Sequence, residues 1–232
     1  MTVLPDFTIL VIVAIIGIII FVVVRNEKQN RELLQTVTTF DRGTRSEHAL
    51  TLKLLKSGIN AQAIFHDLYV KTSNGGFTQI DLVVATKQGI IVFEDKYYSG
   101  WIFGNGKQNN WTQILAYGRD KFRFYNPIKQ NSGHILHLQR LLGENVPYYS
   151  VIVFNGDCEL KNITDVPHNT FVIRPWDVIN VVKTIKNRSE VTYINQNRIV
   201  ALLRQSVENG KCLNVKMQHA ETVRNAKYNK NR

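Results

Sequence analysis

The chain has 232 residues, of which 44% are hydrophobic and 10% aromatic, values that suit one globular domain with additional segments. Its formal net charge of +11 favours a polyanionic partner, either nucleic acid or an anionic membrane face. The two cysteines, Cys158 and Cys212, fit no metal or redox spacing and are expected to be free thiols, which excludes a disulfide-stabilised scaffold. No Gly-Lys-Ser/Thr phosphate loop and no Ser or Cys nucleophile elbow occurs.

An apolar segment lies close to the N-terminus. Residues 7–24 are uncharged, and a helix over them would rise about 27 Å, close to the hydrocarbon core of about 30 Å. A cleavable signal peptide would need a basic start and a small-residue cleavage site, and a buried core helix would need a polar face, all of which are missing. Three basic residues follow the segment: Arg25, Lys28 and Arg31. We therefore predict a single-pass membrane anchor over residues 1–25, with the N-terminus outside the cell membrane and the rest in the cytoplasm.

The segment after the anchor leads into a first helix. Residues 26–40 are predicted to form a polar stalk, and a helix is expected from Thr44 to about Ser57. Glu47 follows Thr44 at the spacing of a capping box, which is one interpretation of this residue. Glu47 also shares its helix face with apolar side chains and would therefore point toward a sheet, which favours a role in a site. The two interpretations are compatible.

Two apolar, β-branched segments, residues 79–85 and 90–96, flank a short polar loop and predict an antiparallel hairpin. With a loop over residues 86–89, Ala85 pairs with Ile90 and the register continues until Asp81 faces Glu94. Directly opposed residues hold their Cβ atoms about 4.5–5.5 Å apart. Because side chains alternate along a strand, the three apolar side chains on one face of the first strand would be Ile80, Leu82 and Val84. Both hairpin faces are apolar, as in a sheet covered by helices on each side.

Two facing carboxylates repel each other unless a cation lies between them. The predicted opposition of Asp81 and Glu94 therefore indicates a metal site with these two residues as ligands. The alternative is a salt-bridged strand end, in which Lys96 pairs with one of the two carboxylates. Both interpretations depend on the hairpin register.

A basic and aromatic region follows the hairpin. Residues 97–110 are predicted to form a Gly-rich loop, and the aromatic character continues to residue 125. Five basic residues are interleaved there: Lys107, Arg119, Lys121, Arg123 and Lys129. This mixture suits phosphate contacts and base stacking. The alternative is a helix with aromatic core residues and a basic outer face.

The rest of the chain is predicted to alternate strands and helices. A helix is expected over residues 131–142, ended by Gly143, with Gln130 and His134 on one face. His134 and His137 could share a metal ion, or His134 could be a packed core histidine. Further elements are expected as strands over 149–154 and 170–173, and as helices over 176–185 and 195–207. Residues 211–232 are predicted to form a basic flexible tail that can contact nucleic acid or anionic lipid.

The order of these motifs resembles a known family. The segments Gln79-Ile80-Asp81, Phe93-Glu94-Asp95-Lys96, and Asn126-Pro127-x-x-Gln130 with His134 are similar to the nuclease-related domain (NERD) of the PD-(D/E)xK superfamily. An upstream Gly43-Thr44-Arg45-Ser46-Glu47 resembles the first helical block of that family, which usually has Gly where this chain has Ser46. The resemblance covers residues 40–145.

The resemblance implies a restriction-endonuclease-like α/β fold: a mixed sheet flanked by helices, with an α-β-β-β-α-β core and one N-terminal transmembrane helix. We assign the core to residues 41–150 and the C-terminal part of the same domain to residues 151–210. Because hard cations prefer oxygen ligands, the expected cofactor is Mg²⁺ or Mn²⁺.

The expected site contains five residues. Asp81 and Glu94 would hold the metal ion, and the resemblance adds a contribution from Glu47. Lys96 would place a positive charge where negative charge develops on the phosphate. Gln130 would position water or phosphate. The side chain of Asp95 points to the opposite strand face and is excluded.

The predicted function is that of a membrane-anchored, metal-dependent nuclease that hydrolyses DNA, in preference to RNA, at the cytoplasmic face of the membrane. The alternative is a non-catalytic, membrane-tethered module that binds nucleic acid or serves as a scaffold.

Overall fold

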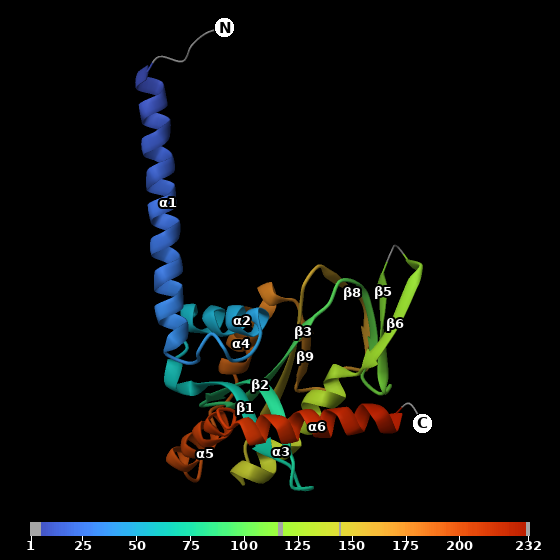
Figure 1. The fold of residues 1–232 in the computed structure, drawn as a ribbon. Helices are drawn as coiled ribbons and strands as arrows, with labels where there is room; N and C mark the ends of the chain where they lie inside the picture. The colour runs from blue at the N-terminus through green and yellow to red at the C-terminus, as the bar shows by residue number, and fades with distance from the viewer. Residues whose placement is uncertain (1–5, 116–117, 144, 231–232) are drawn as a thin grey trace.

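The structure is a computed structural model that describes residues 6–115, 118–143 and 145–230. Two mixed β-sheets are flanked by helices, and one long N-terminal helix extends away from the rest of the molecule (Figure 1). This architecture confirms the predicted α/β class with a mixed sheet. The helices are α1 (Asp6–Gln35), α2 (Arg45–Lys56), α3 (Pro127–Leu142), α4 (Val178–Lys186), α5 (Gln196–Asn209) and α6 (Leu213–Lys230), with 3-10 turns η1 (Ala61–Ala63) and η3 (Pro175–Asp177). The strands are β1 (Ile64–Lys71), β2 (Phe77–Thr86), β3 (Gly89–Tyr97), β4 (Gly100–Asn105), β5 (Asn110–Leu115), β6 (Asp120–Tyr125), β7 (Tyr148–Asn155), β8 (Cys158–Thr164) and β9 (Thr170–Ile173).

The first sheet has five strands in the order β1-β2-β3-β7-β9. β1, β2 and β3 are antiparallel neighbours, whereas β7 pairs parallel to both β3 and β9. The predicted α-β-β-β-α-β order is present as α2-β1-β2-β3-α3-β7, with β4 to β6 inserted before α3. Side chains of α2 and α4 pack on one face around Phe93, and those of α3 and α5 pack on the other around Val92. Both faces are covered, which explains the apolar character of both faces of the hairpin.

The β2–β3 hairpin has the predicted register. Pairing runs from Thr86 opposite Gly89, through Ala85 opposite Ile90, to Leu82 opposite Phe93. The prediction that Ile80 shares a sheet face with Leu82 is wrong. Ile80 packs with Val83 on the α3 side of the sheet, whereas Leu82 lies on the α2 side. The physical reason lies in the neighbouring strand, where Asp67 has a φ of 54°. This left-handed residue interrupts the alternation of β1, and β2 follows the same change of face opposite it.

The region predicted as a loop, or as a basic helix, forms a second sheet with the strand order β6-β5-β4-β8. β4 to β6 form an antiparallel meander, and β8, which the sequence analysis did not predict, pairs parallel to β4. Trp111, Ile102 and Phe154 of β7 form the core of this sheet, and the rings of Trp111 and Phe154 stack. The aromatic residues are therefore core residues in part, but of a sheet and not of a helix.

Helix α3 begins four residues earlier than predicted. The side chain of Asn126 accepts hydrogen bonds from the backbone N–H groups of Ile128 and Lys129, and Pro127 occupies the first turn. Asn126 is thus a helix N-cap, and Pro is favoured at the following position because it has no N–H to satisfy. Gln130 consequently lies in the first turn of α3, next to the end of β3.

The C-terminal segment also differs from the prediction of a flexible tail. Residues 213–230 form α6, which packs across β2 (Figure 1). The ring of His219 donates a hydrogen bond of 3.0 Å to the Phe77 carbonyl and packs edge-on against Tyr69. The segment lacks an apolar stripe, so the sequence offered no helical periodicity. Residues 231 and 232 of the predicted tail lie outside the described residues.

The N-terminal helix continues beyond the predicted anchor. The apolar, membrane-spanning candidate runs over residues 9–35, and the residues from 9 to 24 are exposed. Its last turns reach the domain, where Leu33 and Val37 pack on the α2 side of the first sheet. The chain therefore carries one apolar helix compatible with a single-pass membrane anchor, and this helix includes most of the predicted stalk.

Candidate active site

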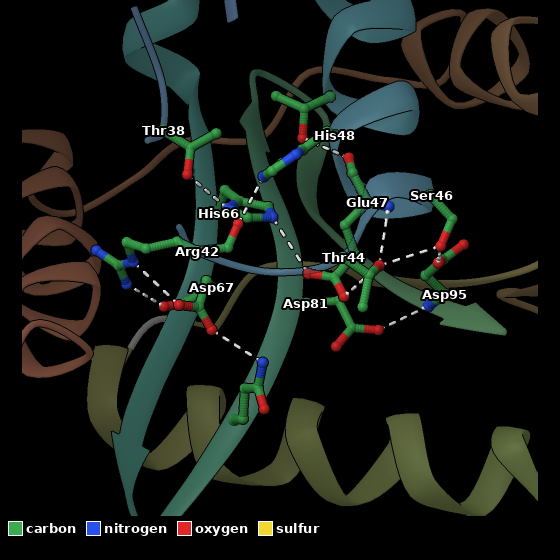
Figure 2. A network of polar contacts seen from close by, with 12 residues as sticks. Thr38, Arg42, Thr44, Ser46, Glu47, His48, His66, Asp67, Asp81 and Asp95 are labelled. Carbon is green, nitrogen blue, oxygen red and sulfur yellow. Dashed lines mark hydrogen bonds and ion pairs between the residues drawn. The ribbon is translucent and has the colours of Figure 1, made fainter. Parts of the chain in front are cut away.

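Glu47 lies in the first turn of α2 and is almost completely buried. The N-cap residue Thr44 accepts a hydrogen bond of 3.3 Å from the Glu47 backbone N–H and donates one of 2.8 Å to Glu47 Oε1. Glu47 is thus part of the helix cap, and its carboxylate also points toward Asp81 (Figure 2). The two interpretations of Glu47 from the sequence are compatible in the structure.

Asp81 lies where the β2–β3 ladder ends. The last paired residues are Leu82 and Phe93, so Asp81 and Glu94 do not form a ladder pair. Instead, Asp81 Oδ2 accepts a hydrogen bond of 2.7 Å from the backbone N–H of Asp95. Burial raises the pKa of Asp81 well above its usual range, and the charges of Glu94 and Glu47 raise it further. Two other carboxylates therefore come close enough at this strand end to affect the ionisation of Asp81.

Glu94 is 1% exposed and is held between two cationic or potentially cationic groups. Lys96 Nζ lies 2.5 Å from Glu94 Oε1, and His134 Nε2 lies 3.2 Å from Oε2. Burial alone would raise the pKa of Glu94, but the interactions with His134 and Lys96 outweigh it and lower the pKa. Glu94 is therefore stabilised as a carboxylate, in contrast to Asp81.

Lys96 connects β3 to α3. Its Nζ donates a hydrogen bond of 3.1 Å to Gln130 Oε1, in addition to its ion pair with Glu94. Burial would lower the pKa of Lys96, but the charge of Glu94 more than compensates and raises it. Lys96 is thus held as a cation among the carboxylates, and the predicted residues Glu94, Lys96 and Gln130 form one connected group.

His134 belongs to this group, although the sequence analysis left it open as a packed core histidine. Its Nδ1 lies 3.0 Å from Thr78 Oγ1 while its Nε2 faces Glu94. The available signal was the four-residue spacing between Gln130 and His134, which places both on one face of α3. Within the described residues, no group of three or more His, Cys, Asp or Glu side chains forms a ready-made metal-ligand cluster, so no third ligand accompanies His134 and His137.

A second histidine, which the sequence analysis did not identify, supports Glu47. His66 of β1 places Nε2 3.2 Å from Glu47 Oε2, and its Nδ1 lies 2.8 Å from Thr38 Oγ1 (Figure 2). All three residues are buried. The chain from Thr38 through His66 to Glu47 therefore connects the segment that follows α1 with the site. A histidine inside the apolar run of β1 was the only signal in the sequence.

Asp95 points away from this group, as the sequence analysis expected. Its carboxylate accepts hydrogen bonds from Ser46 of α2 and Asn155 of β7. Burial raises the pKa of Asp95, although both hydrogen bonds oppose that rise. Ser46 stands where the resembling family usually has Gly, and here its hydroxyl joins α2 to β3.

The carboxylate group fits a hard divalent cation by its donor chemistry. Glu47 Oε2 and Glu94 Oε2 are buried, and among the described residues neither has a well-aligned hydrogen-bond donor, since each faces only a histidine nitrogen at 3.2 Å. Buried acceptors without donors are costly, and a cation would satisfy them. Mg²⁺ commonly needs only one or two carboxylates and completes its shell with water and substrate oxygens.

A mixed sheet that presents Asp, Glu and Lys at the open end of a β-hairpin, next to a helix carrying Gln, is consistent with the PD-(D/E)xK superfamily. Residues 42–155 match the family described as the nuclease-related domain, NERD. The chain therefore contains a nuclease-related domain, as its motifs predicted.

One curated relative extends the comparison without adding a function. An uncharacterised protein of Bacillus anthracis is 34% identical over 122 residues, which is 53% of this chain and 57% of that protein. The chain thus matches a little more than half of the length of this relative. No solved structure matches the chain significantly.

Proposed function

We propose that this protein is a membrane-anchored, metal-dependent nuclease that hydrolyses phosphodiester bonds in DNA at the cytoplasmic face of the membrane. The observation that carries the proposal is the connected set of Glu94, Lys96 and Gln130 beside the carboxylates of Asp81 and Glu47. The nuclease-related domain over residues 42–155 supports the same chemistry.

In this proposal Asp81, Glu94 and Glu47 hold Mg²⁺ or Mn²⁺, and when bound the ion supplies charge neutralisation and activation of water. Lys96 Nζ stabilises the negative charge that develops on the phosphate. Gln130, which already accepts a hydrogen bond from Lys96, keeps this ammonium group in place and orients water or phosphate. His134 holds Glu94 from the side opposite to Lys96.

The test uses the full chain in detergent micelles with plasmid DNA and with labelled single- and double-stranded oligonucleotides. Cleavage is expected with Mg²⁺ or Mn²⁺ and none with a chelator. Asp81→Ala should lose metal affinity, measured directly by isothermal titration, together with cleavage. A wild-type protein that binds DNA in the presence of metal and never cuts it would contradict the proposed nuclease.

One observation favours the alternative, a membrane-tethered nucleic-acid-binding or scaffold module. Glu94 already has an ion pair with Lys96 at 2.5 Å through Oε1, and His134 Nε2 lies 3.2 Å from its Oε2. Under this alternative, the interactions with Lys96 and His134 hold Glu94 in the absence of metal. This alternative predicts DNA binding that is unchanged by chelator, and no metal uptake in the titration.

A further inference from the structure

The second sheet has an inner and an outer face, and its pairing defines which residues belong to each. Ile102 and Trp111 are fully buried and point to the inner face. Their neighbours along the strands therefore point outward. Two rows of paired residues cross this outer face: Glu159, Trp101, Ile114 and Lys121 in one, and Asn162, Phe103, Thr112 and Arg123 in the next.

The outer face is not covered by another layer. No helix of the described residues packs extensively against β4, β5, β6 or β8. Ile128 of α3 does pack against this sheet, but on its inner side, next to Trp111. Trp101, Phe103 and Thr112 are each only partly buried, although they lie in the middle of the sheet. Antiparallel sheets often have one face open to solvent, but such a face is usually polar, so neighbouring aromatic residues on it indicate a contact surface.

On this face, β4 carries the aromatic residues Trp101 and Phe103, and β6 carries the basic residues Lys121 and Arg123. Lys161 Nζ lies 5.3 Å from the centre of the Trp101 ring, and Tyr125 at the end of β6 is 42% exposed. Lys121 and Arg123 are exposed, and no ion pair with an acidic side chain of the described residues is present for either. The face thus offers flat rings for stacking and positive charges free to contact an anion.

A polar hollow lies at the edge of the same face. Its volume is about 270 Å³, and its lining consists of Gln108, Asn109, Asn110, Thr112 and Arg123. Amide, hydroxyl and guanidinium groups can hydrogen-bond the edges of nucleobases as well as phosphate oxygens. The hollow therefore suits a nucleotide unit and not an apolar ligand.

The first turn of α3 joins this face to the candidate active site. Lys129 Nζ donates a hydrogen bond of 2.7 Å to Asn109 Oδ1 at the hollow, and its neighbour Gln130 accepts one from Lys96 in the site. β4 also begins only four residues after Lys96. The hollow and the candidate active site are thus contacted by neighbouring residues of one helix turn.

We propose that the outer face of the second sheet is a binding platform for single-stranded nucleic acid. Bases would stack on Trp101, and on Tyr125 at the rim, while Lys121 and Arg123 contact the backbone phosphates. We expect single strands and not duplexes, because bases within a duplex are already stacked on each other and cannot stack on a protein ring. The inference deepens the proposed nuclease function and rests on it for its biological use, but binding can be measured without turnover.

The experiment measures fluorescence anisotropy of a labelled single-stranded oligothymidylate with the full chain in detergent, with chelator present so that cleavage plays no part. Lys121→Gln/Arg123→Gln should weaken binding about tenfold and make the slope of log affinity against log salt shallower by about 1.4, since each lost phosphate contact on a single strand contributes about 0.7. The matched control, Lys183→Gln/Lys186→Gln, removes the same charge from the exposed side of α4 and should change affinity less than twofold.

The contribution of base stacking is tested separately, with substitutions of Trp101. Trp101→Phe retains a ring and should keep most of the affinity, whereas Trp101→Leu should lose about tenfold. The thermal midpoint of each variant, measured in the same detergent, separates a loss of binding from a loss of folding. A Trp101→Leu variant with unchanged midpoint and unchanged affinity overturns the platform.

The other outcomes also decide the proposal. If Lys121→Gln/Arg123→Gln and Lys183→Gln/Lys186→Gln lose the same affinity, only the net charge of the protein matters. That result overturns the proposed platform. Equal affinity for a duplex of the same length, or binding of vesicles containing anionic phosphatidylserine in place of the oligonucleotide, assigns the face to duplex DNA or to lipid and also overturns it. If the protein binds the single strand through this face but never cleaves it in the presence of metal, the platform is supported and the proposed nuclease function is contradicted.

Discussion

At the residue scale, the two carboxylates that the sequence treats as equivalent have opposite environments. Burial would raise the pKa of both carboxylates. His134 and Lys96 outweigh it at Glu94 and lower that pKa, whereas at Asp81 the charges of Glu94 and Glu47 add to the effect of burial. The difference arises because Lys96 of β3 and His134 of α3 both contact the Glu94 carboxylate, whereas neither contacts Asp81 directly within the described residues. The same position near a strand end therefore produces one carboxylate that stabilises the fold and one that destabilises it.

The pH dependence of stability should reveal this difference in metal-free protein. A raised folded pKa means that the folded state binds the Asp81 proton more tightly than the unfolded state, so stability should fall as the pH rises above about 3.9. Asp81→Asn keeps an acceptor for the Asp95 N–H and should raise the thermal midpoint at neutral pH, with no gain below pH 4. The measurement is thermal unfolding across pH in chelator.

Glu94→Gln should behave in the opposite way. Its lowered pKa stabilises the fold above the unfolded value, and that contribution is lost as the pH falls through the folded pKa. Replacing Glu94 leaves Lys96 partly buried without its anion, and breaking such a pair typically costs about 3–5 kcal/mol. A Glu94→Gln protein that is as stable as wild type at pH 7 would show that the ion pair is not formed.

Lys96→Ala tests catalysis separately from metal binding. Loss of a charge-stabilising donor should reduce cleavage about 100-fold or more, while metal and DNA binding persist because Lys96 acts on the phosphate. Titration of Mn²⁺ and oligonucleotide anisotropy provide these two readouts. Lys87→Ala, which changes an exposed lysine paired with Glu190, is the control and should cleave at the wild-type rate.

At the element scale, Arg42 connects three parts of the chain. Its guanidinium pairs with Asp67 of β1 at 3.0 Å and donates to the carbonyl of Val207 in α5 at 2.9 Å. Both charged side chains are buried, and Asp67 also accepts a hydrogen bond of 2.9 Å from Gln79. The segment between α1 and α2, and with it the Thr38 contact to His66, depends on this connection.

Arg42→Met should therefore destabilise the protein by about 3–5 kcal/mol, because it leaves the Asp67 carboxylate buried without its cation. Chemical denaturation of the detergent-solubilised chain would measure the loss. Arg45→Ala, three residues away on the exposed side of α2, should change stability by less than about 0.5 kcal/mol. Similar effects of the two substitutions would mean that Arg42 contributes only as a surface charge.

At the scale of the whole molecule, one apolar helix precedes the domain, and basic residues follow its apolar part. The positive-inside rule then predicts, as we propose, that the domain lies in the cytoplasm. Cys212, exposed just before α6, is a natural reporter of the location of the domain.

An impermeant maleimide applied to intact cells should label a Thr2→Cys variant at its N-terminus but not Cys212. Cys212 should react only after the cells are permeabilised. Labelling of Cys212 in intact cells would place the domain outside, away from cytoplasmic DNA. Cys158 is partly buried beside Arg174 and contributes little to the signal.

The sequence by itself determined the features that depend on local periodicity. Alternation and turn residues defined the β2–β3 hairpin and its register, the apolar run defined the apolar part of α1, and capping residues defined the start of α2. The candidate group of Asp81, Glu94 and Lys96 followed from that register because neighbouring residues of one hairpin cannot lie far apart.

Only the tertiary structure decided which partners these residues have. His66 and His134 reach Glu47 and Glu94 from elements far away in the sequence, and α6 packs on β2 without any apolar stripe. The second sheet was missed because its strands are short and aromatic residues lie on both of its faces, so the alternation of apolar and polar residues is weak. Long-range burial and charge pairing are properties of the assembled fold, and no local pattern in the chain encodes them.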